Sequence, residues 1–229
     1  MEVSKKETAA FPEEKPREVV ESRSWNPEYS RYYTSNHDRA YHSDQIIYGQ
    51  VTDFSCEAGR NFIFTYEKVQ IREVLQGDLN VGDTISVVKW SGEVTVREMI
   101  DGKRAAGLEE EAAAYEEEYK GKDLDSLVIH DSGYHDIDSE IGQKSVYFLE
   151  ELDWEDTKNL YARIDASKSQ YLEISDGVFE STFDVFKERT DEEDSDSRDA
   201  SEKPSLYTLE ELVESFTPPP VSLNIPTAG

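Results

Sequence analysis

The chain is poor in the residues that cross-link proteins or hold transition metals. Its 229 residues include one cysteine, Cys56, and four histidines. A single cysteine excludes an internal disulfide, and no set of cysteines and histidines has the spacing of a zinc site. The sequence therefore predicts a fold that is stabilised by packing, without a cross-link of either kind.

Long apolar runs are also absent. No stretch approaches the ~20 apolar residues that cross a bilayer, and Met1–Pro12 lacks the apolar core of a signal peptide. Two interpretations follow: a cytosolic protein, or an exported protein whose signal has been removed. One cysteine is compatible with both.

Basic residues are scarce. Lysine and arginine number 24 against 51 aspartates and glutamates, which gives a formal net charge of −27. Such a surface repels the phosphate backbone of nucleic acid and anionic lipid headgroups. We expect no nucleic-acid partner, no direct membrane insertion and a monomeric chain. The negative charge favours a basic protein or peptide as partner. The alternative is that the acidic surface serves only to keep the protein soluble.

Composition predicts one medium-sized domain with polar extensions. Hydrophobic residues make up 36% and charged residues 33%, whereas the 11% of aromatic residues argues against disorder throughout. The predicted divisions are a polar N-terminal tail (1–42), an OB-like β-barrel domain (43–183), an acidic linker (184–205), a C-terminal amphipathic helix (206–217) and a tail (218–229).

A long hairpin over Asn61–Trp90 is the predicted centre of the barrel. In its first strand the apolar residues change parity between Glu67 and Lys68, which predicts a bulge there. The second strand is apolar on both faces and is predicted to be central in its sheet. Further strands are predicted at 46–54, 94–99, 144–152, 160–166, 169–175 and 178–183, and Asp176 with Gly177 predicts a two-residue hairpin turn between the last two.

Two helices are predicted. Leu108–Tyr119 combines strong helix formers with glutamates near its start, where the helix dipole favours them. In Leu206–Phe216, Thr208 and Glu211 have the spacing of a capping box. The second helix is too short to be stable alone, so we expect it to pack on the barrel, with a partner as the alternative.

The order of elements predicts a mainly β protein with minor α structure. Meander strands, a helix and further strands are typical of a small antiparallel Greek-key barrel of the OB type. One internal acidic helix and one C-terminal helix complete the predicted fold.

Four stretches carry a resemblance to a group of uncharacterised proteins of Gram-positive bacteria. They are Asp44 with Gly49–Val51, Val74–Ile85, Gly142–Leu149 and Gln170–Val178. That group is similar in topology to the OB-like domain of netrin modules and metalloproteinase inhibitors, and its members are usually exported or attached to the cell surface. The resemblance implies the fold and an extracytoplasmic location. It brings no catalytic residues, and the chain lacks the terminal cysteine of an inhibitory wedge or lipid anchor.

One stretch, HDSGYHDID, has residues that could form a reactive site. Imidazole and carboxylate groups so close together could bind a divalent metal ion. A histidine could also act as a general base, with an aspartate that orients its ring. The spacing matches neither the HExxH helix nor a calcium loop. The candidate ligands are His130, Asp131, His135, Asp136 and Asp138.

The sequence therefore favours a noncatalytic binding or interaction module, without a cofactor, whose ligand it does not specify. We expect this module to act outside the cytoplasm. The alternative is a metal-dependent hydrolase that uses the loop from His130 to Asp138.

Overall fold

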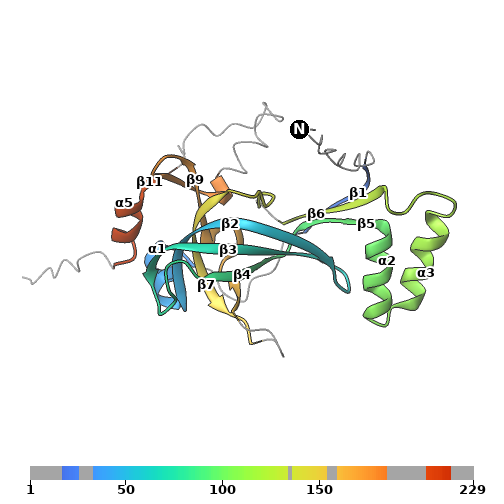
Figure 1. The fold of residues 1–229 in the computed structure, drawn as a ribbon, viewed down its shortest axis with the longest axis horizontal. Helices are drawn as coiled ribbons and strands as arrows, with labels where there is room; N and C mark the ends of the chain where they lie inside the picture. The colour runs from blue at the N-terminus through green and yellow to red at the C-terminus, as the bar shows by residue number, and fades with distance from the viewer. Residues whose placement is uncertain (1–16, 26–32, 134–135, 154–158, 185–204, 218–229) are drawn as a thin grey trace, which may run out of the picture.

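The computed structural model of the protein describes residues 17–25, 33–133, 136–153, 159–184 and 205–217 (Figure 1). The strands are β1 (Glu18–Trp25), β2 (Gln45–Ala58), β3 (Ile63–Gln76), β4 (Thr84–Lys89), β5 (Gly92–Thr95), β6 (Leu127–Gly133), β7 (Lys144–Glu151), β8 (Leu160–Arg163), β9 (Gln170–Ser175), β10 (Val178–Ser181) and β11 (Leu206–Thr208). The helices are α1 (Asn36–His42), α2 (Val96–Ala105), α3 (Glu109–Glu118), α5 (Leu209–Glu214) and the 3-10 helix η1 (Ala166–Ser169).

Five strands close into a barrel, which confirms the predicted fold class. Around the barrel the order is β2, β3, β4, β8 and β7, and β7 pairs with β2 to complete the circle. All of these pairings are antiparallel except that of β4 with β8. A closed Greek-key barrel of five strands, with helices inserted between the third and fourth, has the architecture of an OB fold.

Strand β7 is shared between the barrel and a sheet extension. Its C-terminal half pairs with β8, whereas its N-terminal half pairs with β9. The chain therefore leaves the edge of β7 after Arg163 and returns to it at Gln170, with η1 between. From β9 the sheet continues through β10 to β11, and the predicted turn at Asp176 and Gly177 joins β9 to β10.

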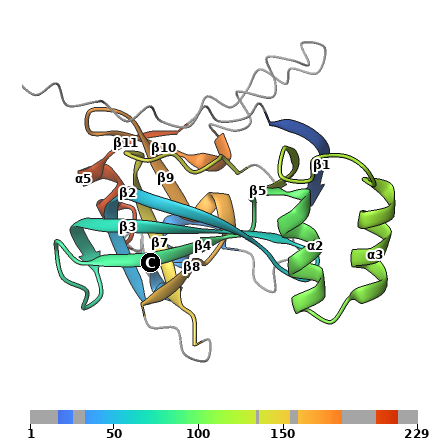
Figure 2. The same ribbon diagram turned by 45° about the vertical axis from the view of Figure 1, so that its right-hand side comes forward.

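The connection between β4 and β7 forms a second layer at one end of the molecule (Figures 1 and 2). Here β1, β6 and β5 make a three-stranded sheet, and α2 and α3 lie beside it. Their core contains Ile63, Val94, Met99 and Ile129, all of which are buried. The acidic helix predicted at Leu108–Tyr119 is confirmed as α3.

Two sequence predictions in this layer need correction. The strand predicted at 94–99 stops at Thr95, where α2 begins, because Thr95 and Glu98 form a capping box that starts the helix. The N-terminal tail predicted at 1–42 contains β1, which pairs in parallel with β6, and α1, whose Ala40 is buried. The other part of the predicted tail, 1–16 and 26–32, lies outside the described residues, as does most of the predicted linker.

A separate hydrophobic core joins the C-terminal helix α5 to the outer face of the barrel. Leu212 of α5 is fully buried against Val146, Phe148 and Phe179. The Phe216 ring lies 5.2 Å from that of Phe148. Thr208 and Glu211 form the predicted capping box, and the helix packs on its own barrel as expected. It begins only at Leu209, however, because Leu206–Thr208, predicted as its first residues, form strand β11 and pair with β10.

The change of face predicted between Glu67 and Lys68 of β3 is wrong; the register shifts that place an extra residue in β3 come only after Ile71. The residues of β3 that point into the barrel keep one parity from Thr65 through Glu67 to Val69, and all three are buried. The extra residue at this position lies in β2, since the register shifts between Val51 and Asp53. The polar side chains of Thr65 and Glu67 therefore occupy interior positions.

Among the described helices, none has both the length and the apolar character that crossing a bilayer requires.

Candidate functional site

Four of the five predicted metal ligands lie among the described residues, and these four do not converge. Asp131 lies in β6 and is 2% exposed. Its carboxylate accepts two hydrogen bonds from Arg23, at 2.5 and 2.8 Å, and one from the Ile63 backbone N–H at 3.1 Å. His130 is the preceding residue of the same strand and therefore points to the opposite face. Asp131 consequently ties β1 and β3 to β6.

Asp136 belongs to a different environment. Both of its carboxylate oxygens accept hydrogen bonds from the Arg163 guanidinium, and Oδ1 lies 3.9 Å from the Lys89 ammonium. Asp138 is exposed, and His135 lies outside the described residues. Within the described ranges, no three histidine, cysteine, aspartate or glutamate side chains form a group that could hold a metal ion. Among the described residues, the candidate ligands therefore form no metal site.

The charges that do converge are inside the barrel. Glu67 of β3 and Lys89 of β4 are both fully buried, with Oε1 and Nζ 3.5 Å apart. Lys89 also donates to the Ile137 carbonyl at 2.5 Å, and Ser139 donates to Glu67 Oε1 at 2.5 Å. We call Glu67, Lys89, Asp136 and Arg163 the charged cluster. It contains two acids and two bases, so it is formally neutral.

Hydrogen bonds extend the charged cluster to the neighbouring strands. Arg163 donates to Gln170 Oε1 at 2.9 Å, and Gln170 donates to the Ser145 hydroxyl at 3.0 Å. Tyr147 donates to Glu67 at 3.3 Å. Paired charges with satisfied hydrogen bonds are the form in which ionised groups are tolerated in an interior.

Two pKa shifts follow from this environment. Burial alone would raise the pKa of Asp136, but the charges of Arg163 and Lys89, with hydrogen bonds from Arg163 and the Ile137 N–H, bring it down to about 2. Burial, together with the Glu67 carboxylate, raises the pKa of Tyr147 well above its usual value. Asp136 is therefore ionised and Tyr147 protonated at neutral pH, and neither is suited to accept or release a proton there.

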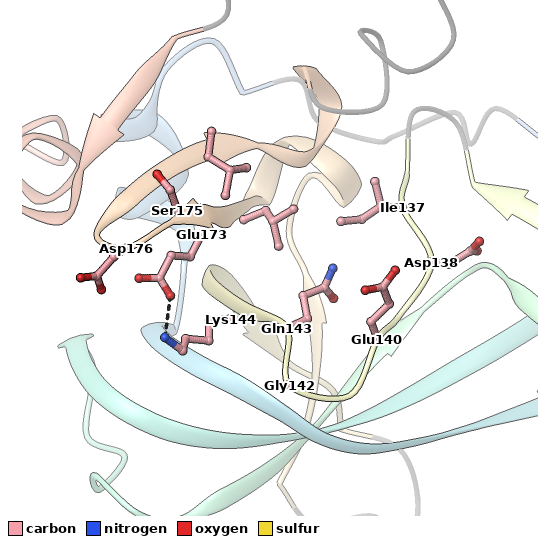
Figure 3. A pocket seen from close by; sticks show the side chains of 11 residues that line it. Ile137, Asp138, Glu140, Gly142, Gln143, Lys144, Glu173, Ser175 and Asp176 are labelled. Atoms are coloured by element: carbon pink, nitrogen blue, oxygen red, sulfur yellow. Dashed lines mark ion pairs between the residues drawn. The ribbon is translucent and has the colours of Figure 1, made fainter.

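A groove of about 620 Å³ lies on the surface next to the charged cluster (Figure 3). One wall is the segment that leads into β7, and the other is the end of β9 with its turn. The lining residues are Ile137, Asp138, Glu140, Gly142, Gln143, Lys144, Leu172, Glu173, Ile174, Ser175 and Asp176. Four of these are acidic and one is basic, and we call this hollow the acidic groove.

The basic residue of the acidic groove is neutralised within it. Lys144 Nζ lies 3.0 Å from Glu173 Oε2, and Figure 3 shows this ion pair between the two walls. Glu173 also accepts from the Tyr48 hydroxyl and from the Gly177 N–H, each at 2.9 Å. Partial burial opposes these contacts, but they lower the pKa of Glu173. Asp138, Glu140 and Asp176 supply the remaining negative charge, and all three are exposed.

The charged cluster and the acidic groove share one segment, 136–140. Asp136 and Ser139 contact the cluster, while Asp138 and Glu140 line the groove. Lys89 and Arg163 thereby hold the groove wall in place from inside the barrel. The arrangement can bind a cationic group at the surface, but it presents no reactive pair.

The outer face of β3 and β4 has aromatic residues of the kind that bind ligands in some OB folds. The Trp90 ring lies 5.8 Å from that of Phe62 and 5.4 Å from that of Phe64, and Trp90 is 42% exposed. A face that binds single-stranded nucleic acid also needs basic groups along it. Lys89, the basic residue beside Trp90, points into the barrel, whereas Lys68 of β3 is exposed on the outer face and donates to the Ser86 hydroxyl at 2.6 Å.

Comparisons of the chain with protein-family models, with curated proteins and with solved structures find no match.

Most residues of the charged cluster and of the acidic groove were not predicted from the sequence. Sequence analysis identified Asp136 and Asp138 as ligands of a metal, and it used Asp176 only as a turn residue. Glu67 had a detectable signal, because Ile63, Thr65, Glu67, Val69 and Ile71 keep one parity over the first part of β3. The partners of Glu67 come from β4 and from the segment before β7, and no local pattern connects these three places.

Proposed function

We propose that this chain is a noncatalytic binding module that holds a basic segment of a protein or peptide in the acidic groove. The observation that carries the proposal is the charge of the groove. Of its five charged lining residues, Lys144 is paired with Glu173, which leaves three exposed carboxylates with no lysine or arginine among the lining residues to oppose them. A cationic partner would neutralise these carboxylates on binding.

The apolar lining residues favour lysine and arginine side chains over a bare metal ion. Ile174 is 44% exposed, and Leu172 and Ile137 also line the groove. Lysine and arginine place their aliphatic stems along apolar surface while the charged head reaches an acid. A divalent cation gains nothing from apolar neighbours, since it requires several converging oxygens.

The paired state of the neighbouring ionisable groups supports a noncatalytic role. Asp136 is held by Arg163, and Glu173 accepts hydrogen bonds from two side chains and one backbone N–H. A general base needs a free lone pair and a pKa near the working pH. Both carboxylates have lowered pKa values and occupied oxygens, so they suit binding and positioning.

The proposal includes a place of action outside the cytoplasm, which rests on the resemblance to exported proteins of Gram-positive bacteria. Fractionation of cells that express the natural gene tests this part. Recovery in the surface or culture fraction is the expected result, and recovery only with the cytosol would contradict it.

Binding is tested with a fluorescent acetyl-Lys-Thr-Lys-Thr-Lys-Thr-amide peptide followed by anisotropy. The triple variant Asp138→Asn, Glu140→Gln, Asp176→Asn removes the exposed charge of the groove and should weaken binding about tenfold, since each exposed ion pair contributes only ~0.5 kcal/mol. Added salt should have a similar effect on the unmodified protein.

The matched control removes the same number of charges from α3. Glu110, Glu117 and Glu118 are exposed there, and α3 lies far from the groove (Figure 2). Their replacement by glutamine should change the affinity less than about twofold. Equal losses in both triple variants would mean that the peptide responds only to net charge, and an absence of binding to the unmodified protein would refute the proposal.

A further inference from the structure

The acidic groove opens where two strands of one sheet separate. Strand β9 pairs with β7 only through Gln170, Tyr171 and Leu172. It continues to Ser175 and pairs there with β10 on its other side. Among the described residues, Glu173–Ser175 therefore has no ladder partner on the side that faces the groove.

The opposite wall is a strand edge of the same kind. The Val51 N–H donates to the Gln143 carbonyl at 2.9 Å, and the Gly142 N–H donates to the Val51 carbonyl at 2.8 Å. These bonds join the approach to β7 to β2, on the side away from β9. Within the described chain, the β7–β9 ladder includes no residue of this approach.

Side chains fix the two edges relative to each other at one end of the groove. The ion pair between Lys144 and Glu173 bridges the walls at the closed end, immediately beyond the last ladder pair, Ser145 with Leu172. Glu173 also fixes the β9 turn by accepting from the Gly177 N–H. The Gln143 side-chain oxygen, which lines the groove, is buried and has no hydrogen-bond partner among the described residues. A preformed opening loses little ordering entropy when a ligand enters it.

From this geometry, and resting on the proposed function, we infer that the basic partner binds as an extended strand that adds to the open edge of β9 at Glu173–Ser175. Strand addition supplies backbone donors and acceptors to an unpaired edge, and alternate side chains then give selectivity. Lysines at every second position would face one side of the added strand. A helical partner could not serve, because its backbone groups are already paired within the helix.

Strand addition is tested with two backbone-methylated forms of the Lys-Thr peptide. In an extended chain, the N–H groups of alternate residues point to opposite edges. One peptide is N-methylated at its threonines and the other at its lysines, so each loses the donors of one edge and keeps its charge. With the lysine side chains facing the acids, the strand direction decides which edge of the peptide meets β9. We expect the antiparallel direction, as in the pairing of β9 with β7 and β10, so one edge of the peptide meets β9.

The expected result is that one methylated peptide binds about tenfold more weakly than the parent while the other binds within about twofold, as the loss of two or three hydrogen bonds predicts. Amide hydrogen exchange of the protein should slow at Glu173–Ser175 on addition of the parent peptide, and should stay unchanged in α3.

The outcomes separate this inference from the proposed function. If both methylated peptides bind as well as the parent, or if exchange at Glu173–Ser175 does not change, strand addition is wrong while the binding function stands. If the parent peptide itself fails to bind, the proposed function is wrong and this inference falls with it.

Discussion

The two halves of the barrel interior are built by opposite means. At one end, branched aliphatic residues of β2, β3 and β4 pack against Tyr147, Leu149 and Tyr161. At the other end, the same strands β3 and β4 contribute Glu67 and Lys89, which meet Asp136 and Arg163. One pair of strands therefore lines an apolar interior over half its length and an ionic interior over the other half.

This difference indicates that the charged half serves positioning more than stability. A buried ion pair is costly to desolvate, and well-packed apolar side chains of similar volume often stabilise a fold as much or more. The charged cluster, however, holds segment 136–140, whose outer face lines the acidic groove. Apolar residues would fill the same space without fixing that segment through directed hydrogen bonds.

Removal of one charge from the cluster should have the largest effect. In Lys89→Met the Glu67 carboxylate loses its buried counter-ion, and the loss of one partner from such a pair costs about 3–5 kcal/mol of unfolding free energy. Urea unfolding at pH 7 measures this cost.

The double variant Lys89→Met, Glu67→Leu tests the cause of that loss. It removes one charge of each sign and leaves the ion pair between Asp136 and Arg163. Unfolding free energy should recover by more than half, because no unpaired charge stays buried. If the double variant is no more stable than the single one, lost packing and not charge explains the cost.

A truncation in the apolar half should have the next largest effect. Ile85 is 2% exposed among the aliphatic residues of that half, and Ile85→Ala should cost about 3 kcal/mol through lost burial and a residual cavity. The cost should be the same at pH 7 and pH 3, since no titratable contact changes. A cost that depends on pH would show that the two halves are coupled.

The apolar half could be predicted from the sequence to a much larger extent than the charged half. Alternation of aliphatic residues located β2, β3, β4 and β7, and the turn at Asp176 and Gly177 located the β9–β10 hairpin. The same reasoning followed the apolar residues of β3, so it predicted a change of face between Glu67 and Lys68 and did not place Glu67 in the interior. Strand parity is set by the backbone and holds whatever the side chain, which makes it the safer guide.

Helix α2 was predictable by a rule applied elsewhere in the same chain. Thr208 and Glu211 were recognised as a capping box, whereas Thr95 and Glu98 have the same spacing and were read as part of a strand. Two valines beside them favoured the strand. The acidic groove was not predictable, because its walls are brought together by the pairing of β7 with β9.

Acid should weaken the charged half selectively. The pKa of Asp136 in the folded protein is about 2, below the ordinary 3.8, so its contribution is complete above pH 4 and is lost as pH falls through 2. The loss should amount to roughly 2 kcal/mol. Unfolding free energies measured between pH 5 and pH 2 check it. The pKa of Asp165 is raised, because burial outweighs the charge of Arg39. Ionisation of Asp165 therefore lowers the unfolding free energy as the pH rises above its ordinary pKa of 3.8.

Two variants separate Asp136 from the other carboxylates. Asp136→Asn should be less stable at pH 7 and should lose less of its unfolding free energy on acidification than the unmodified protein. Ile85→Ala should keep the full acid-dependent loss. An equally steep loss in Asp136→Asn would assign the effect to other groups.

The smallest effect should come from Ser139, which joins the charged half to the groove wall. Its hydroxyl donates to Glu67 at 2.5 Å and lies 3.3 Å from Lys89 Nζ. Ser139→Ala removes one donor to a buried carboxylate while every charge stays paired, so it should cost only about 1 kcal/mol by urea unfolding. Ser175→Ala on the opposite, exposed wall is the matched control and should change stability by less than about 0.5 kcal/mol. Equal costs for the two serines would mean that segment 136–140 gains nothing from its contact with the charged cluster, and the positioning role argued above would be wrong.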